Sequence, residues 1–113
     1  DKNMIKQVLF NMILNSIEAL KEKEGKYKFI KIKTYLETIK NINFVVLEIE
    51  DNGTGIKDED KEKIFKPFFT TKQKGTGLGL PMVYKIVFSH NGTISIESEY
   101  GKGVKFIIKF KVQ

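Results

Sequence analysis

The sequence contains no cysteine and no arginine among its 113 residues. Without cysteine, the chain has no disulfide scaffold, no thiolate metal site and no cysteine nucleophile, and a reducing compartment is permitted. The missing arginine removes the side chain that most often reads guanine through paired hydrogen bonds, which disfavours a nucleic-acid-binding module. No apolar run approaches the about 20 residues of a membrane-spanning helix, so direct membrane insertion is not expected.

The apolar residues that are present suffice for one packed domain. Hydrophobic residues make up 41% of the chain, and the length suits a single core. The first residues, DKNMIKQ, carry neither an initiator methionine nor the pattern of a signal peptide. We therefore expect residues 1–113 to form one domain, and this domain to be the C-terminal fragment of a longer protein.

Hydrophobic periodicity and turn residues divide the chain into helices and strands. Two long helices are expected at about residues 3–23 and 80–89, and a short helix is expected to begin near Asp58 as its N-cap. Four strands are expected, at residues 28–37, 44–50, 93–99 and 104–112, with a turn at residues 41–43 between the first two. This order predicts an α+β fold, a two-layer α/β sandwich.

The last strand indicates how the layers are arranged. Its alternate residues divide into an apolar face and a face rich in lysine, and the apolar set is Val104, Phe106, Ile108, Phe110 and Val112. A mainly antiparallel sheet with one apolar face is covered by helices on that face only. The net charge of +6, which is due to lysine alone, then serves mainly the solubility of the open sheet face.

The first helix carries an unusual polar stripe formed by Gln7, Asn11, Asn15 and Glu18. Asn11 and Asn15 stand one turn apart, so their side chains project together. A solvent-facing stripe would more often carry lysine and glutamate, because asparagine is a mediocre helix former. Two interpretations stay open: a cleft wall that offers neutral oxygen ligands to Mg²⁺, or a pair of amides that bind a nearby loop.

The segment DNGTGI follows a strand rich in valine and leucine. Such a segment is often only a turn. Alternatively, Asp51 lies at the floor of a cleft and accepts a hydrogen bond from an exocyclic amine. Gly53 and Gly55 would then let a flat ring approach the backbone.

The segment IFKPFFTTK has no helical or strand period, and little regular structure is expected between Gly55 and Gly77. Its aromatic residues could simply pack on the core. Irregular segments of this length in compact domains are more often functional, so a lid is the alternative.

The segment KGTGLGL places three glycines at every second position, directly before the second long helix. Backbone N–H groups that lie unshielded at a helix N-terminus form an anion site. Leu78 and Leu80 would pack beneath the glycines and anchor the helix, whereas a hinge without a ligand is the alternative.

Together, the four motifs resemble the catalytic, ATP-binding domain of bacterial sensor histidine kinases, a superfamily shared with gyrase, heat-shock chaperone and mismatch-repair ATPases. QVLFNMILNSIEAL resembles the asparagine box, DNGTGI the first glycine box, IFKPFFTTK the phenylalanine box and GTGLGL the second glycine box. The variants NSIEAL and PFFTTK are most similar to the sporulation and nitrogen-regulation kinases. The resemblance implies a Bergerat-type ATP-binding fold.

The resemblance also implies roles for single residues. Asn15 would hold Mg²⁺ against the triphosphate, Asn11 would be catalytic near the γ-phosphate, and Asp51 would bind the adenine amino group. Three residues would shape the adenine pocket: Gly53, Gly55 and Ile56. Seven would bind or cover the phosphates: Thr71, Lys72, Gly75, Thr76, Gly77, Leu78 and Gly79.

The implied reaction is donation of the γ-phosphoryl group of ATP to a histidine on an upstream dimerisation domain of the same protein. The resemblance also implies a response regulator as a further partner. It implies a cytoplasmic location for this domain, whether or not the parent protein is membrane-anchored. Asn11 stands where gyrase-type relatives carry a glutamate base, and an amide cannot act as that base, so slow hydrolysis is expected. His90, the only histidine, lies in a helix-ending HNG segment and is expected to be structural.

Two departures from the family pattern affect the implied site. Val104 stands where the family often has Thr or Ser, which would remove a water-bridging hydroxyl near the adenine, and Glu18 stands where many relatives carry a basic residue. Two other functions stay open as alternatives: an ATP-dependent conformational switch of the gyrase type, and a basic nucleic-acid module without nucleotide chemistry.

Overall fold

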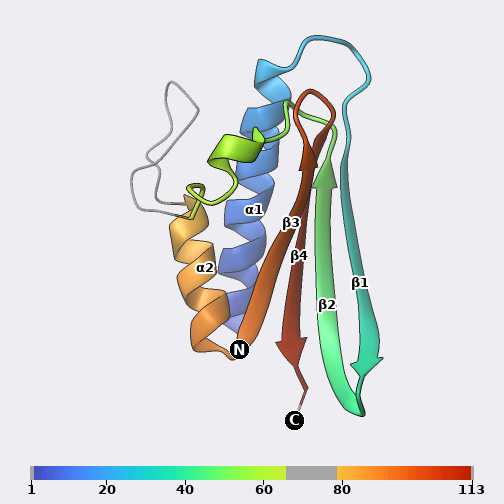
Figure 1. The fold of residues 1–113 in the computed structure, drawn as a ribbon, viewed down its shortest axis with the longest axis vertical. Helices are drawn as coiled ribbons and strands as arrows, with labels where there is room; N and C mark the ends of the chain where they lie inside the picture. Colours follow the sequence, from blue (N-terminus) through green and yellow to red (C-terminus); the bar gives the residue numbers. More distant parts are fainter. Residues whose placement is uncertain (1, 66–78, 113) are drawn as a thin grey trace.

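The computed structural model describes residues 2–65 and 79–112, which form two layers (Figure 1). The helices are α1 (Lys2–Glu22), the 3₁₀ helix η1 (Asp58–Asp60) and α2 (Gly79–Ser89), and the strands are β1 (Ile30–Ile39), β2 (Ile42–Asp51), β3 (Gly92–Glu99) and β4 (Gly103–Lys111). The strands form one sheet in the order β1-β2-β4-β3, in which all neighbours are antiparallel. The predicted two-layer α/β sandwich is therefore confirmed.

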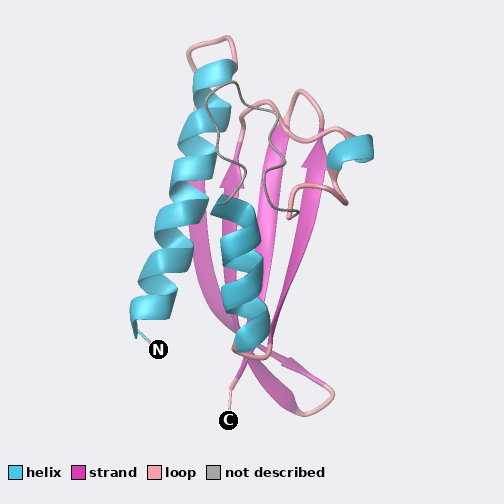
Figure 2. Ribbon diagram, turned by 90° about the vertical axis from the view of Figure 1, so that its left-hand side faces the viewer, coloured by secondary structure: helices cyan, strands magenta, loops and turns pink. Residues whose placement is uncertain are grey.

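Both long helices cover the same face of the sheet (Figure 2). α1 buries residues that recur every three or four positions, as an amphipathic helix does: Val8, Met12, Ser16 and Ala19. α2 contributes Val83 and Val87, and the sheet contributes alternate residues of β2 and β4, including Ile49, Phe106 and Ile108. One core therefore fixes α1 and α2 against the two central strands.

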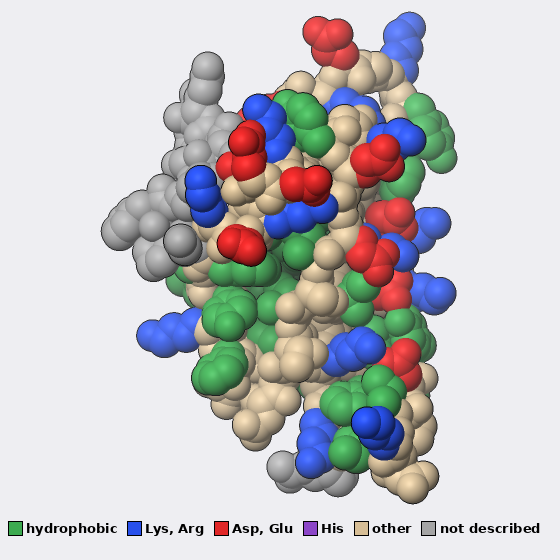
Figure 3. All heavy atoms as spheres, in the orientation of Figure 1, with side chains coloured by type: hydrophobic (Ala, Val, Ile, Leu, Met, Phe, Trp, Pro, Cys, Tyr) green, Lys and Arg blue, Asp and Glu red, His purple; other side chains and the backbone are tan. Residues whose placement is uncertain are grey.

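The opposite face of the sheet is polar but not bare. Val46 points to this face and is fully buried, because its cross-strand neighbours Tyr35 and Lys109 flank it. Lys109 Nζ lies 2.7 Å from Glu37 Oε1, and Lys105 Nζ lies 3.6 Å from Glu48 Oε1. Figure 3 shows acidic and basic side chains interspersed along the right-hand edge. Charges of both signs on this face suit solubility better than binding of a polyanion.

A hydrogen bond from Tyr35 to Glu48 belongs to the same polar face. The hydroxyl of Tyr35 donates to Glu48 Oε2, and this bond is the main cause that raises the pKa of Tyr35 to about 12. The same bond, aided by Lys105, lowers the pKa of Glu48. The ionised carboxylate and the neutral phenol therefore stabilise each other.

The β1–β2 hairpin extends further than the sequence indicated. Its turn lies at Lys40 and Asn41, whose φ angles of 51° and 66° are typical of a type I′ turn. The predicted turn at residues 41–43 is therefore wrong, and both strands run towards the tip. The hairpin projects past the helical layer (Figure 2). This position leaves Leu36 76% exposed, although it lies on the face that the helices cover elsewhere.

The short helix predicted near Asp58 is present as the 3₁₀ helix η1, but the predicted cap is wrong. Lys57 occupies the cap position with an extended backbone and makes no side-chain capping bond. Asp58 lies in the first turn instead, with Oδ1 2.7 Å from Lys61 Nζ. No helix in the described ranges 2–65 and 79–112 is long and apolar enough to span a membrane.

Candidate active site

Asp51 is the last residue of β2 and is only 2% exposed. Its Oδ1 accepts a hydrogen bond from the N–H of Gly53 at 2.9 Å. In the sheet it pairs with Ile30 on one side and Val104 on the other, so apolar neighbours flank it. A carboxylate in such a place is oriented by its strand and by the loop that follows.

The glycines after Asp51 are required by close packing. A Cβ on Gly53 would lie 2.9 Å from Ala19 Cβ on α1. Gly55 has a φ of +74°, and a Cβ there would lie 2.5 Å from the carbonyl oxygen of Glu99. The loop is therefore held between α1 and the β3–β4 turn, and the approach of a flat ring to it remains a prediction.

Ile56 and Ser98 complete the attachment of this loop. The N–H of Ile56 donates to Ser98 Oγ at 2.8 Å, and the Ser98 hydroxyl donates to the Gly103 carbonyl at 2.8 Å. The side chain of Ile56 packs against the core. Ser98 thereby joins the glycine loop to the start of β4, beside the cross-strand pair of Asp51 and Val104.

Two residues of the polar stripe of α1 contact the first turn of α2. Gln7 Nε2 donates to Met82 Sδ at 3.0 Å, and Asn11 Nδ2 lies 3.8 Å from the same sulfur. Asn11 and Asn15 are half-buried, whereas Gln7 and Glu18 are exposed. Asn11 thus contacts α2, and both interpretations of the asparagine pair remain predictions.

α1 connects the two ends of the candidate site. Ala19 lies against Gly53, and Asn11 lies against Met82. Ala19 follows Asn11 by eight positions of helix, which corresponds to about 12 Å along the axis. Asn15 stands midway between them. Along α1, the order is therefore Asn11 near Met82, then Asn15, then Ala19 beside the loop that follows Asp51.

The glycine run is described only at its end. Gly79 is the first residue of α2, and a Cβ there would meet nothing within 4 Å. Leu80 packs against the core, as the sequence predicted. The other predicted phosphate-binding residues lie outside the described residues: Thr71, Lys72, Gly75, Thr76, Gly77 and Leu78. The lid predicted around IFKPFFTTK lies mostly outside them as well.

Several residues that support the site were missed in the sequence. Gly103 has a φ of +130°, and a Cβ there would lie 2.1 Å from the carbonyl oxygen of Asp51. The glycine spacing in YGKG could have indicated such a contact. Ser98 could have been found from the alternation of its strand, which places it on the same face as Ile94 and Ile96. Asn52 gave no signal beyond its place in a turn motif.

His90 lies at the C-terminal end of α2. Its Nδ1 is 2.8 Å from the carbonyl oxygen of Ile86, one turn earlier. A side chain that pairs with a terminal carbonyl helps to end a helix. This contact agrees with the structural role predicted for His90.

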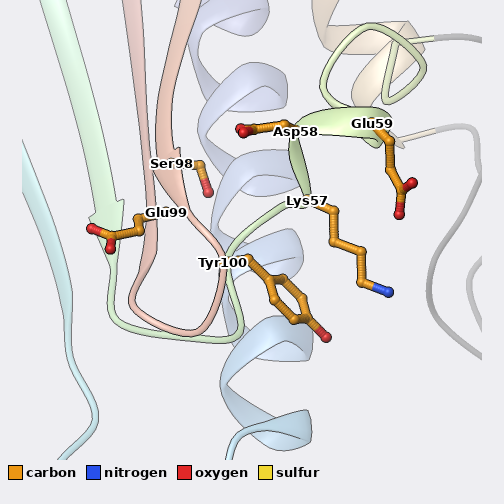
Figure 4. Close-up of a pocket in the computed structure, with 6 residues that line it drawn as sticks. All are labelled: Lys57, Asp58, Glu59, Ser98, Glu99 and Tyr100. Carbon is orange, nitrogen blue, oxygen red and sulfur yellow. The ribbon is translucent and has the colours of Figure 1, made fainter.

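A separate surface hollow of about 540 Å³ is shown in Figure 4. Its lining residues come from the segment around η1 and from the β3–β4 turn, and they are Lys57, Asp58, Glu59, Ser98, Glu99 and Tyr100. The side chains of Lys57 and Glu59 point away from those of Ser98 and Glu99 (Figure 4). The charged groups therefore do not converge on one point, and none of them is a predicted site residue.

The two helices and the four-stranded antiparallel sheet place the domain in the α/β sandwich class. The chain belongs to the family described as histidine kinase-, DNA gyrase B- and HSP90-like ATPases, whose sequence model matches residues 1–113.

Curated relatives within this family are sensor kinases. The chain is 42% identical to sporulation kinase C of Bacillus subtilis (strain 168), over 94% of this chain and 23% of the relative. It is 40% identical to the sensor histidine kinase ZraS of Escherichia coli O157:H7, over 96% of this chain and 22% of the relative. The chain thus spans less than a quarter of either relative.

Solved structures agree with this assignment. The nucleotide-free catalytic domain of the histidine kinase ThkA superposes with a TM-score of 0.78 at 42% identity, covering 98% of this chain and 68% of that one. A mycobacterial sensor histidine kinase, MprB, superposes with a TM-score of 0.80 at 21% identity, which supports the fold alone.

Proposed function

We propose that this chain is the ATP- and Mg²⁺-binding catalytic domain of a two-component sensor histidine kinase. It donates the γ-phosphoryl group of ATP to a histidine on an upstream dimerisation domain of the same protein, in the cytoplasm. A response regulator is the next acceptor. The observation that carries the proposal is the buried carboxylate of Asp51, which accepts a hydrogen bond from the N–H of Gly53 at the end of β2.

The adenine end of the site is assigned to Asp51. An ionised carboxylate only accepts hydrogen bonds, so it suits the exocyclic amine of adenine, which is a donor. Its Oδ1 is already oriented by Gly53. Gly53, Gly55 and Ile56 form the loop beside it, so the base would lie against this loop and near Val104.

The metal end of the site is assigned to Asn15. Mg²⁺ takes oxygen ligands, keeps several waters and is often held by one or two protein groups together with substrate phosphates. The described residues contain no group of three or more His, Asp or Glu side chains that could hold a metal. One half-buried amide on α1 fits this kind of site, in which the triphosphate supplies most ligands. When bound, Mg²⁺ would neutralise charge on the phosphates.

The amide side chain of Asn11 bears on which reaction the site carries out, phosphoryl transfer or hydrolysis. In the transfer, an imidazole nitrogen of the acceptor histidine bonds to the γ-phosphorus while the bond to the β–γ bridging oxygen breaks, and ADP leaves. This reaction needs mainly positioning and charge stabilisation from the protein. Hydrolysis needs a group that positions or deprotonates water, and an amide cannot take the proton. Asn11 therefore favours transfer to histidine.

The phosphate end is assigned to Gly79 at the N-terminus of α2 and to the residues before it: Thr71, Lys72, Gly75, Thr76, Gly77 and Leu78. The first N–H groups of a helix have no partner within the helix and attract anions. The anchoring of Leu80 in the core supports this assignment, because it holds the helix N-terminus at a constant place.

Calorimetric titration with a non-hydrolysable ATP analogue and Mg²⁺ tests the proposal. Asp51→Asn is expected to weaken binding by about a hundredfold, since an amide presents one acceptor and adds a misplaced donor. Asp58→Asn, an exposed carboxylate in η1, serves as the matched control and should bind like the wild type. Equal affinity of wild type and Asp51→Asn would refute the assignment of Asp51.

A further inference from the structure

Asn52 uses its whole side-chain amide to hold the loop between α1 and β1. Its Oδ1 accepts a hydrogen bond from the N–H of Phe29 at 2.8 Å. Its Nδ2 donates to the carbonyl oxygen of Tyr27 at 2.9 Å. The donor and the acceptor of this one amide thus both pair with the backbone of residues 27–29.

This pairing continues the β1–β2 ladder past its end. The last cross-strand pair of the two strands joins Ile30 to Asp51. Beyond it, the amide of Asn52 takes the place of a backbone peptide group, because it offers the same donor and acceptor. Residues 27–29 are therefore tied to the end of β2 without being part of a strand.

A third contact fixes the backbone of Asn52 itself. Lys23 Nζ, just after the end of α1, donates to the carbonyl oxygen of Asn52. This carbonyl belongs to the peptide group whose N–H is that of Gly53, and that N–H holds Asp51 Oδ1 at 2.9 Å. The orientation of one peptide group therefore links Lys23 on one side to the Asp51 carboxylate on the other.

We infer that Asn52 is a positioning residue for recognition of the adenine base, acting through the Gly53 peptide that orients Asp51. The loop of residues 23–29 is then a strap that holds the adenine end of the site in shape. This inference rests on the proposed function for the adenine contact, but its structural step concerns only this chain's own residues.

The test compares Asn52→Ala with Asn43→Ala, whose exposed amide accepts a bond from Thr38 near the hairpin tip. Amide hydrogen exchange at Gly53 is measured by NMR without nucleotide and normalised to Phe106 in the core. Adenosine, which has no phosphate, is then titrated. Asn52→Ala is expected to speed Gly53 exchange about tenfold and to weaken adenosine binding by a similar factor, as loss of about one hydrogen bond predicts.

The readouts separate the inference from the proposed function. The loss of one hydrogen bond should change the Gly53 exchange rate about tenfold. A rate in Asn52→Ala that stays within about twofold of wild type would therefore overturn the role of Asn52. Failure of the wild type to bind adenosine would instead overturn the adenine assignment, while Gly53 exchange still decides the role of Asn52. If Asn52→Ala does not fold, Lys23→Met decides in its place: faster Gly53 exchange supports the inference, and unchanged exchange overturns it.

Discussion

The side-chain amide of Gln7 on α1 donates a hydrogen bond to the sulfur of Met82 on α2 at 3.0 Å. Asn11, one turn further along α1, lies 3.8 Å from the same sulfur. The thioether is a weak acceptor, but it ties the proposed catalytic amide to the helix that begins at Gly79. The position of Asn11 therefore depends on where α2 begins.

Met82→Leu tests this dependence. Leucine has a similar volume but no acceptor, so we expect a stability loss below about 1.5 kcal/mol. The side-chain NH₂ signals of Gln7 and Asn11 should shift in NMR spectra, because both lose the sulfur. Met4→Leu, a change on the part of α1 that packs against the core, is the control and should leave them unchanged. Unshifted signals in Met82→Leu would contradict the contact.

Gly103→Ala should destabilise the domain far more than Gly101→Ala. Both glycines have positive φ angles, of +130° and +90°, but only Gly103 would bring a Cβ against backbone, 2.1 Å from the Asp51 carbonyl oxygen. We expect a cost of about 3 kcal/mol or more at Gly103, against about 1–2 kcal/mol at Gly101 for backbone strain alone. Chemical denaturation measures both, and equal losses would contradict the close approach.

Tyr35 should titrate late in a spectrophotometric pH titration of the phenols. Its hydrogen bond to Glu48 raises the pKa of Tyr35 in the folded domain to about 12. The bond therefore stabilises the fold fully below the unfolded pKa of about 10, and this stabilisation is lost as pH rises through about 12. At the acid end, the lowered pKa of Glu48 means that stability is lost as pH falls through its folded value.

The Tyr35→Phe variant is the check on this assignment. In this variant, the phenolate step at the highest pH should disappear. Its free energy of unfolding should differ from that of the wild type mainly at pH values between the protonation of Glu48 and the deprotonation of Tyr35. A late step that persists in Tyr35→Phe would assign it to another tyrosine. Glu48→Gln should keep the step but move it to lower pH, because the main cause of the raised pKa is the bond to Glu48.

Lys40→Asn with Asn41→Gly should stabilise the β1–β2 hairpin. Both residues have positive φ angles, of 51° and 66°, and Asn-Gly is the preferred pair in a type I′ turn. We expect a gain of up to about 1 kcal/mol, chiefly from removing lysine from the left-handed region. Thermal unfolding measures it, and Thr38→Asn with Ile39→Gly, which would weaken β1, is the opposite control.

The elements that lie in the core were predictable, because periodicity reports burial directly. Both long helices follow from it to within one residue at each end, and the strand expected at residues 44–50 lies within β2. The hairpin turn was misplaced because Lys40 has no turn signal, whereas the asparagines at 41 and 43 have one. The leucine at position 36 is exposed because the helices end before the hairpin does, and strand alternation alone does not report the length of the covering layer.

The support of the candidate site was less predictable. Asn52, Ser98 and Gly103 each make a contact with a residue far away in the sequence: Asn52 with Phe29, Ser98 with Ile56 and Gly103 with Asp51. Such contacts depend on the order and register of the strands, and the pattern of a single sequence does not predict either. Asp51 and Asn11 were predicted as site residues because glycines at spacing two follow Asp51 and because asparagine is a mediocre helix former.

The most direct measurement follows the γ-phosphate of labelled ATP in the parent protein, as wild type and as Asn11→Ala. We expect acid-labile, alkali-stable label on a histidine outside this domain, with little free phosphate released, and loss of that label in Asn11→Ala. Label that appears only as inorganic phosphate, with none on a histidine, would contradict the assignment of this chain as the phosphoryl donor of a histidine kinase.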